Sequence, residues 1–377
     1  MKFLNNFWRS TVKLGEPDWP LLFTAGAIVI FGIIMLTSAS GAFAYSRYND
    51  GYYFIRHQLS ALVVGLLLFA IFYKIDYHLW RKYASAFLVL SGLLLLIVFI
   101  PGLASSANTK AHSWISIFGF SLQTSEFVKL FLLIYLAAWF ESNAGKLTNF
   151  SEGVMPLFVI LTVVGVLLLK QPDFGTLSIV IAMVLAAWYV AGAKLTHIIA
   201  LFLFGALVIG LLITKSDYQA KRIDCFLHPE VNSQQECYQI KQALIAIGSG
   251  GWFGRGFGAS RQKLMFLPEV SGDAIFPIIG EELGFVFGSA LVCLFLFLFF
   301  RGFIVAERAP DLFGQILAIG VVSWFAIQAF INIGGMVNIM PMTGVPLPFV
   351  SSGGSAVMAG MAALGLLLQI SRQVKRR

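Results

Sequence analysis

Ten apolar stretches follow one another along this chain of 377 residues, and they constrain its fold more than any other feature. About 20 consecutive apolar residues are enough for a helix to cross the hydrocarbon layer of a membrane. The sequence therefore predicts an all-α polytopic membrane protein with about ten transmembrane helices. The expected spans are Leu21–Thr37, Gln58–Tyr73, Tyr83–Ile100, Leu122–Phe140, Val154–Leu169, Phe174–Ala193, Leu195–Thr214, Ala274–Phe300, Leu312–Val337 and Ser351–Ile370.

The composition agrees with this interpretation, because 58% of the residues are hydrophobic and only 12% are charged. Soluble globular domains carry about twice that share of charged residues. The formal net charge of +8 does not indicate a nucleic-acid partner, since most of the basic residues flank the expected spans. We expect no nucleic acid to bind.

Lys and Arg in short loops tend to remain on the cytoplasmic side of a membrane. Lys74, Lys194 and Arg301 lie in short loops on the side of the N-terminus, which predicts that both termini are cytoplasmic. Residues 1–20 then form a short cytoplasmic lead and residues 372–377 a basic cytoplasmic tail. The whole chain is expected to form a single transmembrane domain.

Residues 215–272 form a large external loop between the seventh and eighth spans, and this loop contains Cys225 and Cys237. The two cysteines could close a disulfide in an oxidising compartment, or they could remain free thiols. The five histidines do not cluster near the cysteines at the spacing of zinc ligands. We therefore expect no protein-bound metal.

The same loop is rich in glycine between Gly248 and Gly258, and Arg261 and Lys263 follow. Glycine permits close backbone approach and a positive φ, and basic side chains attract phosphate. The segment lacks the Gly-Lys-Ser/Thr ending of a Walker loop. It could be an interfacial turn, a phosphate-binding loop, or both.

Several charged residues lie at or inside the expected spans, where burial is costly unless they are paired or line a wet cavity. Asp273 and Asp173 stand where loops enter helices, so each could be a helix cap or a functional carboxylate. Glu126 and Lys129 have i, i+3 spacing and could form a structural ion pair or shape a cavity. With the cations, these carboxylates could form an outer-face site for an amphiphile with an anionic head. The cations in question are Arg56, Lys129, Arg261 and Lys263.

An enzyme acting on a lipid-linked phosphate and a transporter of the same lipid both remain open on these grounds. From about Asp18 to Arg372, however, the chain contains a series of ordered motifs. They are Thr37–Ser40, Trp114-Ile115, Gln123–Glu126 with Lys129, Gln171–Gly175, Ala246–Gly251, Phe266–Glu269, Asp273, Gly280–Gly284, Ile331–Ile333 and Leu347–Gly354. In these motifs the chain resembles the SEDS family of cell-wall polymerases.

The loop from Gly254 to Lys263 resembles the FtsW-like branch of the family more than the RodA-like branch. Three positions depart from the family pattern: Thr124 replaces a proline, Ser352 replaces a tyrosine, and Ser271-Gly272 replaces His-Thr. The last departure removes a histidine next to Asp273 but leaves the aspartate in place. The cysteine pair is not part of the family pattern.

The resemblance implies an inverting peptidoglycan glycosyltransferase that polymerises lipid II into β-1,4-linked glycan strands for septal or elongation cell-wall synthesis. Asp273 would be the catalytic general base, and undecaprenyl pyrophosphate would leave. The expected substrate-binding residues are Arg56, Glu126, Lys129, Asp173, Arg261, Lys263, Glu269, Ser351 and Ser352. No tightly bound cofactor is expected, although a divalent cation, Mg or Mn, could accompany the substrate pyrophosphate.

The family also implies a multi-pass location in the bacterial cytoplasmic membrane. The expected partners are a cognate class B penicillin-binding protein, which is a transpeptidase, and other membrane proteins of division or elongation. Two other functions fit the same residues. The chain could be a lipid II flippase, for which charges inside the membrane are equally expected, or a non-catalytic division scaffold.

Overall fold

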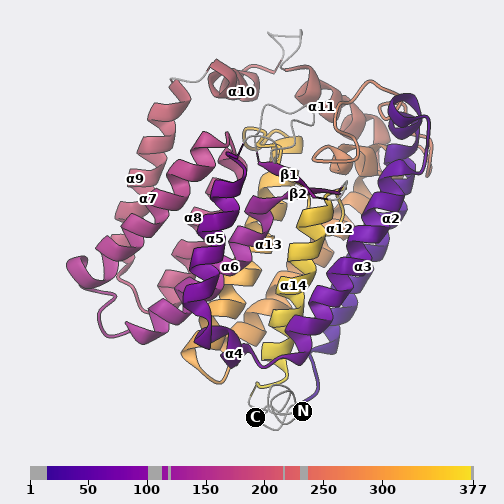
Figure 1. Cartoon of the computed structure of the whole chain (residues 1–377). Coiled ribbons are helices and arrows are strands. Elements are labelled where there is room, and N and C mark those ends of the chain that lie inside the picture. Colours follow the sequence, from indigo (N-terminus) through magenta and orange to yellow (C-terminus); the bar gives the residue numbers. More distant parts are fainter. Residues whose placement is uncertain (1–14, 101–112, 118–119, 215–216, 230–236, 375–377) are drawn as a thin grey trace.

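The computed structural model describes residues 15–100, 113–117, 120–214, 217–229 and 237–374, most of which are helical (Figure 1). Each expected span coincides with one helix, and six helices are long and apolar enough to cross a membrane. The all-α membrane architecture is thereby confirmed, while the count of ten crossings stays a prediction. The helices are α2 (Trp19–Tyr48), α3 (Tyr53–Lys74), α5 (Ala84–Ile97), α6 (Thr124–Ser142), α7 (Met155–Lys170), α8 (Phe174–Val190), α9 (Leu195–Thr214), α12 (Ile275–Glu307), α13 (Leu312–Met336) and α14 (Gly354–Ser371).

Shorter elements join or extend these helices. They are α4 (Tyr77–Lys82), the π-helix η1 (Phe150–Val154), α10 (Asp217–Leu227), α11 (Tyr238–Gly250) and the strands β1 (Trp114–Ile117) and β2 (Phe120–Gln123). The two strands pair antiparallel, with Trp114 opposite Gln123. The span expected to begin at Leu122 therefore begins at Thr124, because Leu122 and Gln123 belong to the hairpin.

Two helices run well past their expected ends. The helix α2 continues beyond Thr37 to Tyr48, and α12 continues beyond Phe300 to Glu307. The helix α2 accommodates polar side chains beyond Thr37, since the Ser40 hydroxyl donates to the Leu36 carbonyl one turn earlier.

The centre of the bundle is formed by α13 and α14, whereas the apolar stretches of α3 and α12 are much less buried (Figure 1). In the most apolar 18-residue stretch of each helix, 83% is buried in α14 but only 17% in α3. The two helices nevertheless pack closely, because a Cβ at Gly365 would lie 2.5 Å from the Phe69 carbonyl oxygen. Small residues allow such close approach between membrane helices.

The two described ends of the chain meet on one face of the bundle, the face that also carries α4. The Gly15 N–H donates to the Arg372 carbonyl, and the Asp18 N–H donates to the Ser371 hydroxyl. Asp18 also caps α2 and pairs with Arg301 at 2.6 Å. The helices α10 and α11 lie at the opposite end (Figure 1).

The helix α12 is broken at Gly284, where φ is +77°. The glycine-rich segment packs against this break: the Arg255 N–H donates to the Glu281 carbonyl, and the Phe285 N–H donates to the Gly251 carbonyl. A Cβ at Gly254 would lie 2.1 Å from the Glu282 carbonyl oxygen, so only glycine fits there. The glycines thus provide the close backbone approach that the sequence indicated.

Candidate active site

Asp273 lies two residues before α12, at the end of the bundle where α10 and α11 are found. Its side chain is partly buried and accepts a hydrogen bond from the Gln239 amide of α11, with 3.3 Å between Nε2 and Oδ1. Its backbone is also fixed, because the Asn332 amide of α13 donates to the carbonyls of Asp273 and Val345, each at 2.8 Å. Two separate helices, α11 and α13, therefore hold Asp273 in position.

The surroundings of Asp273 raise its pKa from an ordinary value of 3.8 to about 7. Burial is the main cause, and the negative charge of Glu269 adds to it, while Arg222 and the Gln239 hydrogen bond act in the opposite direction. Glu269 is held close by the turn between them, since the N–H groups of Gly272 and Ala274 donate to its carbonyl oxygen. A carboxyl group with a pKa near neutrality is suited to take up a proton during a reaction.

A second polar cluster lies inside the bundle. Lys129 is fully buried, and its ammonium group contacts Glu126 at 2.8 Å and the side-chain amide oxygen Oε1 of Gln328 at 2.9 Å. The Gln328 amide in turn donates to the Pro346 carbonyl at 2.9 Å. The predicted pair of Glu126 and Lys129 is present, and it ties α6 to α13 and to the loop before α14.

Asp173 caps α8, because one carboxylate oxygen accepts the Thr176 N–H at 3.0 Å. Its other oxygen accepts the Ser125 hydroxyl, also at 3.0 Å, which places it beside the first turn of α6. The capping alternative is therefore realised. A role of Asp173 in substrate binding stays a prediction.

A third polar cluster holds the loop between α11 and α12 against α12. The Lys263 ammonium group contacts Glu282 at 2.7 Å and the Ser38 hydroxyl at 3.0 Å. Glu281 accepts the Ser260 hydroxyl and the Arg261 N–H. Lys263 is thus committed to a buried ion pair, whereas the Arg261 side chain is exposed.

The remaining expected substrate residues are spread more widely. Arg56 is exposed and pairs with Asp50 near the start of α3. The buried Ser351 hydroxyl accepts the Leu347 N–H, and the Ser352 N–H donates to the Ser271 carbonyl two residues before Asp273. Both serines shape the loop before α14, and their contact with substrate stays a prediction, as does that of Arg56.

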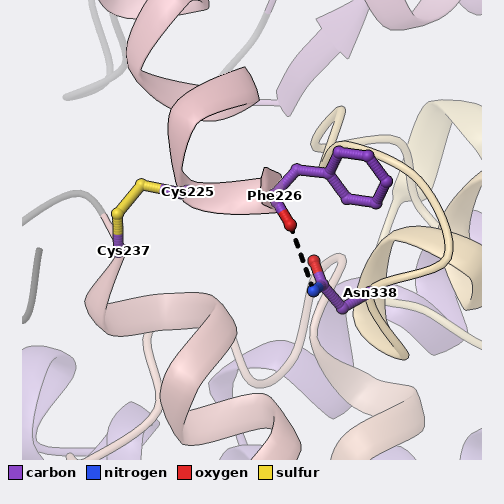
Figure 2. Close-up of a disulfide and its surroundings, with 4 residues drawn as sticks. All are labelled: Cys225, Phe226, Cys237 and Asn338. Carbon is purple, nitrogen blue, oxygen red and sulfur yellow. Dashed lines mark hydrogen bonds between the residues drawn. A yellow bond between two sulfur atoms is a disulfide. The ribbon is translucent and has the colours of Figure 1, made fainter. Parts of the chain in front are cut away.

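Sequence reasoning missed two residues that act on Asp273, namely Arg222 and Gln239. The signal that could have found them is their position beside the cysteines. Cys225 and Cys237 form a disulfide in the structure (Figure 2), and Arg222 and Gln239 lie within one helical turn of it. A cross-link that fixes two helices relative to each other also fixes the positions of the residues beside it.

The fold and the site together define a class: a multi-pass membrane protein with a carboxyl group of raised pKa at one end of a helical bundle. A sequence model for the cell cycle proteins FtsW, RodA and SpoVE matches residues 18–376. The chain therefore belongs to the FtsW/RodA/SpoVE family, as its motifs indicated.

Relatives of known name cover nearly the whole chain. The stage V sporulation protein E of Bacillus subtilis is 37% identical over 96% of this chain and 99% of its own length. A probable peptidoglycan glycosyltransferase FtsW of Trichlorobacter lovleyi is 38% identical over 97% of this chain and 96% of its own length. The named relatives thus lie on the FtsW and SpoVE side of the family.

Solved structures share the fold. The rod shape determining protein RodA of Thermus thermophilus superimposes with a TM-score of 0.71 and 27% identity, covering 96% of this chain and 98% of that one. A chain from a peptidoglycan synthase complex, described as coordinating polymerization and crosslinking, gives a TM-score of 0.77 and 26% identity over 94% and 98%.

Proposed function

We propose that this protein is a peptidoglycan glycosyltransferase that polymerises lipid II into β-1,4-linked glycan strands at the outer face of the bacterial cytoplasmic membrane. Family membership and the names of the relatives support the reaction class. The observation that carries the proposal is Asp273, a partly buried carboxyl with a pKa raised to about 7 at the end of an apolar bundle. A lipid-linked sugar needs such a boundary, because its tail lies in lipid and its head in water.

Asp273 acts as the general base. The carboxylate accepts the proton of the acceptor sugar 4-hydroxyl while that oxygen forms a bond to the donor anomeric carbon. The bond from this carbon to the pyrophosphate oxygen breaks, and its electron pair leaves with undecaprenyl pyrophosphate. One carboxylate suffices for this inverting transfer, since the leaving group is a stabilised anion that needs little help from an acid.

Positive charge is needed where the pyrophosphate departs, because electrostatic stabilisation is often the largest catalytic contribution. Arg261, whose side chain is exposed on the external loop, is the first candidate for this charge. A divalent cation, Mg or Mn, that arrives with the substrate pyrophosphate shares this role. Among the described residues, no group of three His, Cys, Asp or Glu side chains could hold a metal ion of its own.

The protein works with a class B penicillin-binding protein that crosslinks the strands. The similarity to a chain of a peptidoglycan synthase complex supports such a partner. Both termini are cytoplasmic, which puts α10, α11 and their disulfide on the oxidising outer side. The FtsW-like loop and relatives favour a role in septal synthesis.

The test is polymerisation by the purified protein, reconstituted with its transpeptidase partner and labelled lipid II. We expect glycan ladders from the wild type and none from Asp273→Asn or Asp273→Ala. Asp76→Asn is the matched control, because it removes a carboxylate that caps α4 at the opposite end of the bundle.

Normal ladders from both Asp273 variants would assign the chemistry to another residue. If the wild type forms no ladders with its partner, transport of labelled lipid II across vesicles becomes the next measurement. Transport without polymerisation would establish the flippase alternative, and the absence of both would favour the scaffold.

A further inference from the structure

The disulfide joins two short helices that lie above the bundle. Cys225 is in the last turn of α10 and Cys237 is the residue before α11 (Figure 2). Both are buried and pack with Ile240, with Leu244 and Met342 beside them. The cross-link therefore sets the position of one helix relative to the other.

Each helix places one side chain near Asp273. From α11, Gln239 donates to the Asp273 carboxylate at 3.3 Å, and it lies two residues after Cys237. From α10, Arg222 lies three residues before Cys225 and donates to the Met342 carbonyl at 3.1 Å. A Cβ built on Gly344 would lie 3.9 Å from the Arg222 guanidinium and 3.7 Å from the Asp273 carboxylate, so both groups border this glycine.

The turn of α10 that contains Cys225 is also held by a hydrogen bond. The Asn338 amide donates to the Phe226 carbonyl at a long 3.4 Å, as Figure 2 shows. Phe226 and Cys225 are adjacent, so this hydrogen bond and the disulfide act on the same turn. A single long hydrogen bond contributes little compared with a covalent link.

We propose that the Cys225–Cys237 disulfide is a redox-sensitive clamp that holds Arg222 and Gln239 against Asp273 and so sets the proton affinity of the catalytic base. The inference rests on the proposed function, in which Asp273 is that base. Arg222 and Gln239 are positioning residues, because they act through Asp273. A dithiol reductant opens the clamp: it transfers two electrons and two protons to the sulfur–sulfur bond, leaves two thiols, and is itself oxidised to a disulfide.

The direction of the effect follows from the charges that face Asp273. Arg222 and Gln239 both stabilise its ionised form, while Glu269 opposes ionisation. When the clamp opens, Glu269 remains on the adjoining turn but Arg222 and Gln239 are released. The pKa of Asp273 then rises above about 7, and less of the base is ionised near neutral pH.

The experiment measures the initial rate of lipid II polymerisation against pH, with the full chain reconstituted beside its transpeptidase. All variants carry Cys293→Ser, because Cys293 is an exposed free thiol. With dithiothreitol, we expect the midpoint of the rising limb to move upward by about one pH unit. This corresponds to a rate about tenfold lower well below the midpoint and little change above it.

The variant Cys225→Ser with Cys237→Ser is expected to show the shifted profile without reductant and no response when dithiothreitol is added. Because this variant has no disulfide, any response to dithiothreitol in its sample would come from the transpeptidase partner. Arg222→Gln with Gln239→Leu keeps the disulfide, and we expect a similar shift that reduction does not enlarge. Gel filtration and thermal unfolding check that each variant is folded.

An unchanged pH profile in the reduced wild type would overturn the clamp, as would equal sensitivity to reductant in the double-serine variant. A uniform loss of rate at every pH would also overturn it, because that result indicates a general structural role. These results differ from a failure of the proposed function, which would appear as full activity in Asp273→Asn whatever the redox state.

Discussion

The acidity of Asp273 is set mainly by its burial and, after that, by a second carboxyl group four residues away. Glu269 raises the pKa of Asp273 by charge repulsion, in addition to the effect of burial. We expect Glu269→Gln to lower this pKa and to move the rising limb of polymerisation to lower pH. Rates measured across a pH series around 7 test this.

Glu269→Asp is the control, because it keeps the charge and should leave the limb near its original position. A rising limb that does not move in Glu269→Gln would mean that another group limits the rate. The effect is opposite in sign to that of opening the disulfide, so the two can be separated.

The buried pair of Glu126 and Lys129 gives a second prediction. Lys129→Met alone leaves the Glu126 carboxylate uncompensated inside the bundle, which should destabilise the protein by about 3–5 kcal/mol. Glu126→Gln together with Lys129→Met removes both charges and should be much less destabilising. Thermal unfolding in detergent measures the difference, and equal losses in the two proteins would contradict the ion pair.

The sequence located Asp273 because a carboxylate at the border of a long apolar run is visible without a structure. The pairing of Glu126 with Lys129 was equally accessible, since both residues lie on one helix at fixed spacing. Lys263 was different: its partners Glu282 and Ser38 come from two helices far apart in the chain. Such contacts depend on the packing of the whole bundle, so the site could be predicted only in part.

At the scale of the element, the break in α12 depends on glycine. Gly284 has φ of +77°, and a Cβ there would lie 2.2 Å from the Gly254 nitrogen. We expect Gly284→Ala to destabilise the protein by about 2 kcal/mol or more. Gly288→Ala is the matched control on the same helix, since its Cβ would meet only a Phe276 ring atom at 3.9 Å.

Thermal unfolding in detergent compares these two variants with the wild type. If Gly284→Ala unfolds like Gly288→Ala, the break is not a stable part of the fold. A break was not predicted from the sequence, because Gly284 stands in a long apolar run that favours a continuous helix. Only the approach of the loop from Gly251 to Gly256 makes it necessary.

Helix ends show the same limit. Hydropathy located every long helix, because lipid exposure requires an apolar surface over the whole span. It placed the start of α6 inside the strand β2, since Leu122 is apolar in either structure. The hairpin is defined by pairing between strands, which a count of apolar residues does not register.

At the scale of the molecule, a charged cluster joins α4 to the start of α13 on the face where the two described ends of the chain meet. His78 contacts Asp76 at 2.7 Å and Asp311 at 2.6 Å, and Tyr77 donates to Asp311. Hydrogen bonds to Asp311 and Asp76 raise the pKa of His78 from 6.5 to about 9. Burial opposes ionisation of Asp311, but its contacts with His78, the Gly314 N–H and Tyr77 lower its pKa to about 2.

The pKa of His78 is raised in the folded state, so protonated His78 stabilises the fold. This contribution to the free energy of unfolding is complete below pH 6.5 and is lost as the pH rises through about 9. The pKa of Asp311 is lowered instead, so its contribution to stability is present at neutral pH and is lost only as the pH falls toward 2. We expect unfolding temperatures to fall between pH 6.5 and pH 9 by the equivalent of about 1 kcal/mol, since the cluster is partly screened by solvent.

His78→Gln should flatten this dependence, whereas His228→Gln, on the exposed segment after α10, should leave it unchanged. Thermal unfolding across the pH series is the measurement. A wild-type curve that stays flat between these pH values would exclude the contribution of His78.

The packing of α14 against α3 also determines how late in synthesis this part of the protein can fold. Gln58 of α3 donates to the Ser351 carbonyl and accepts the Gly353 N–H, and both partners precede α14. The ribosome synthesises Gln58 almost 300 residues before them, at a rate that makes the interval on the order of tens of seconds. During that time the Gln58 side chain lacks the two partners that it has in the finished protein, so this contact between α3 and the loop before α14 forms only at the end of synthesis.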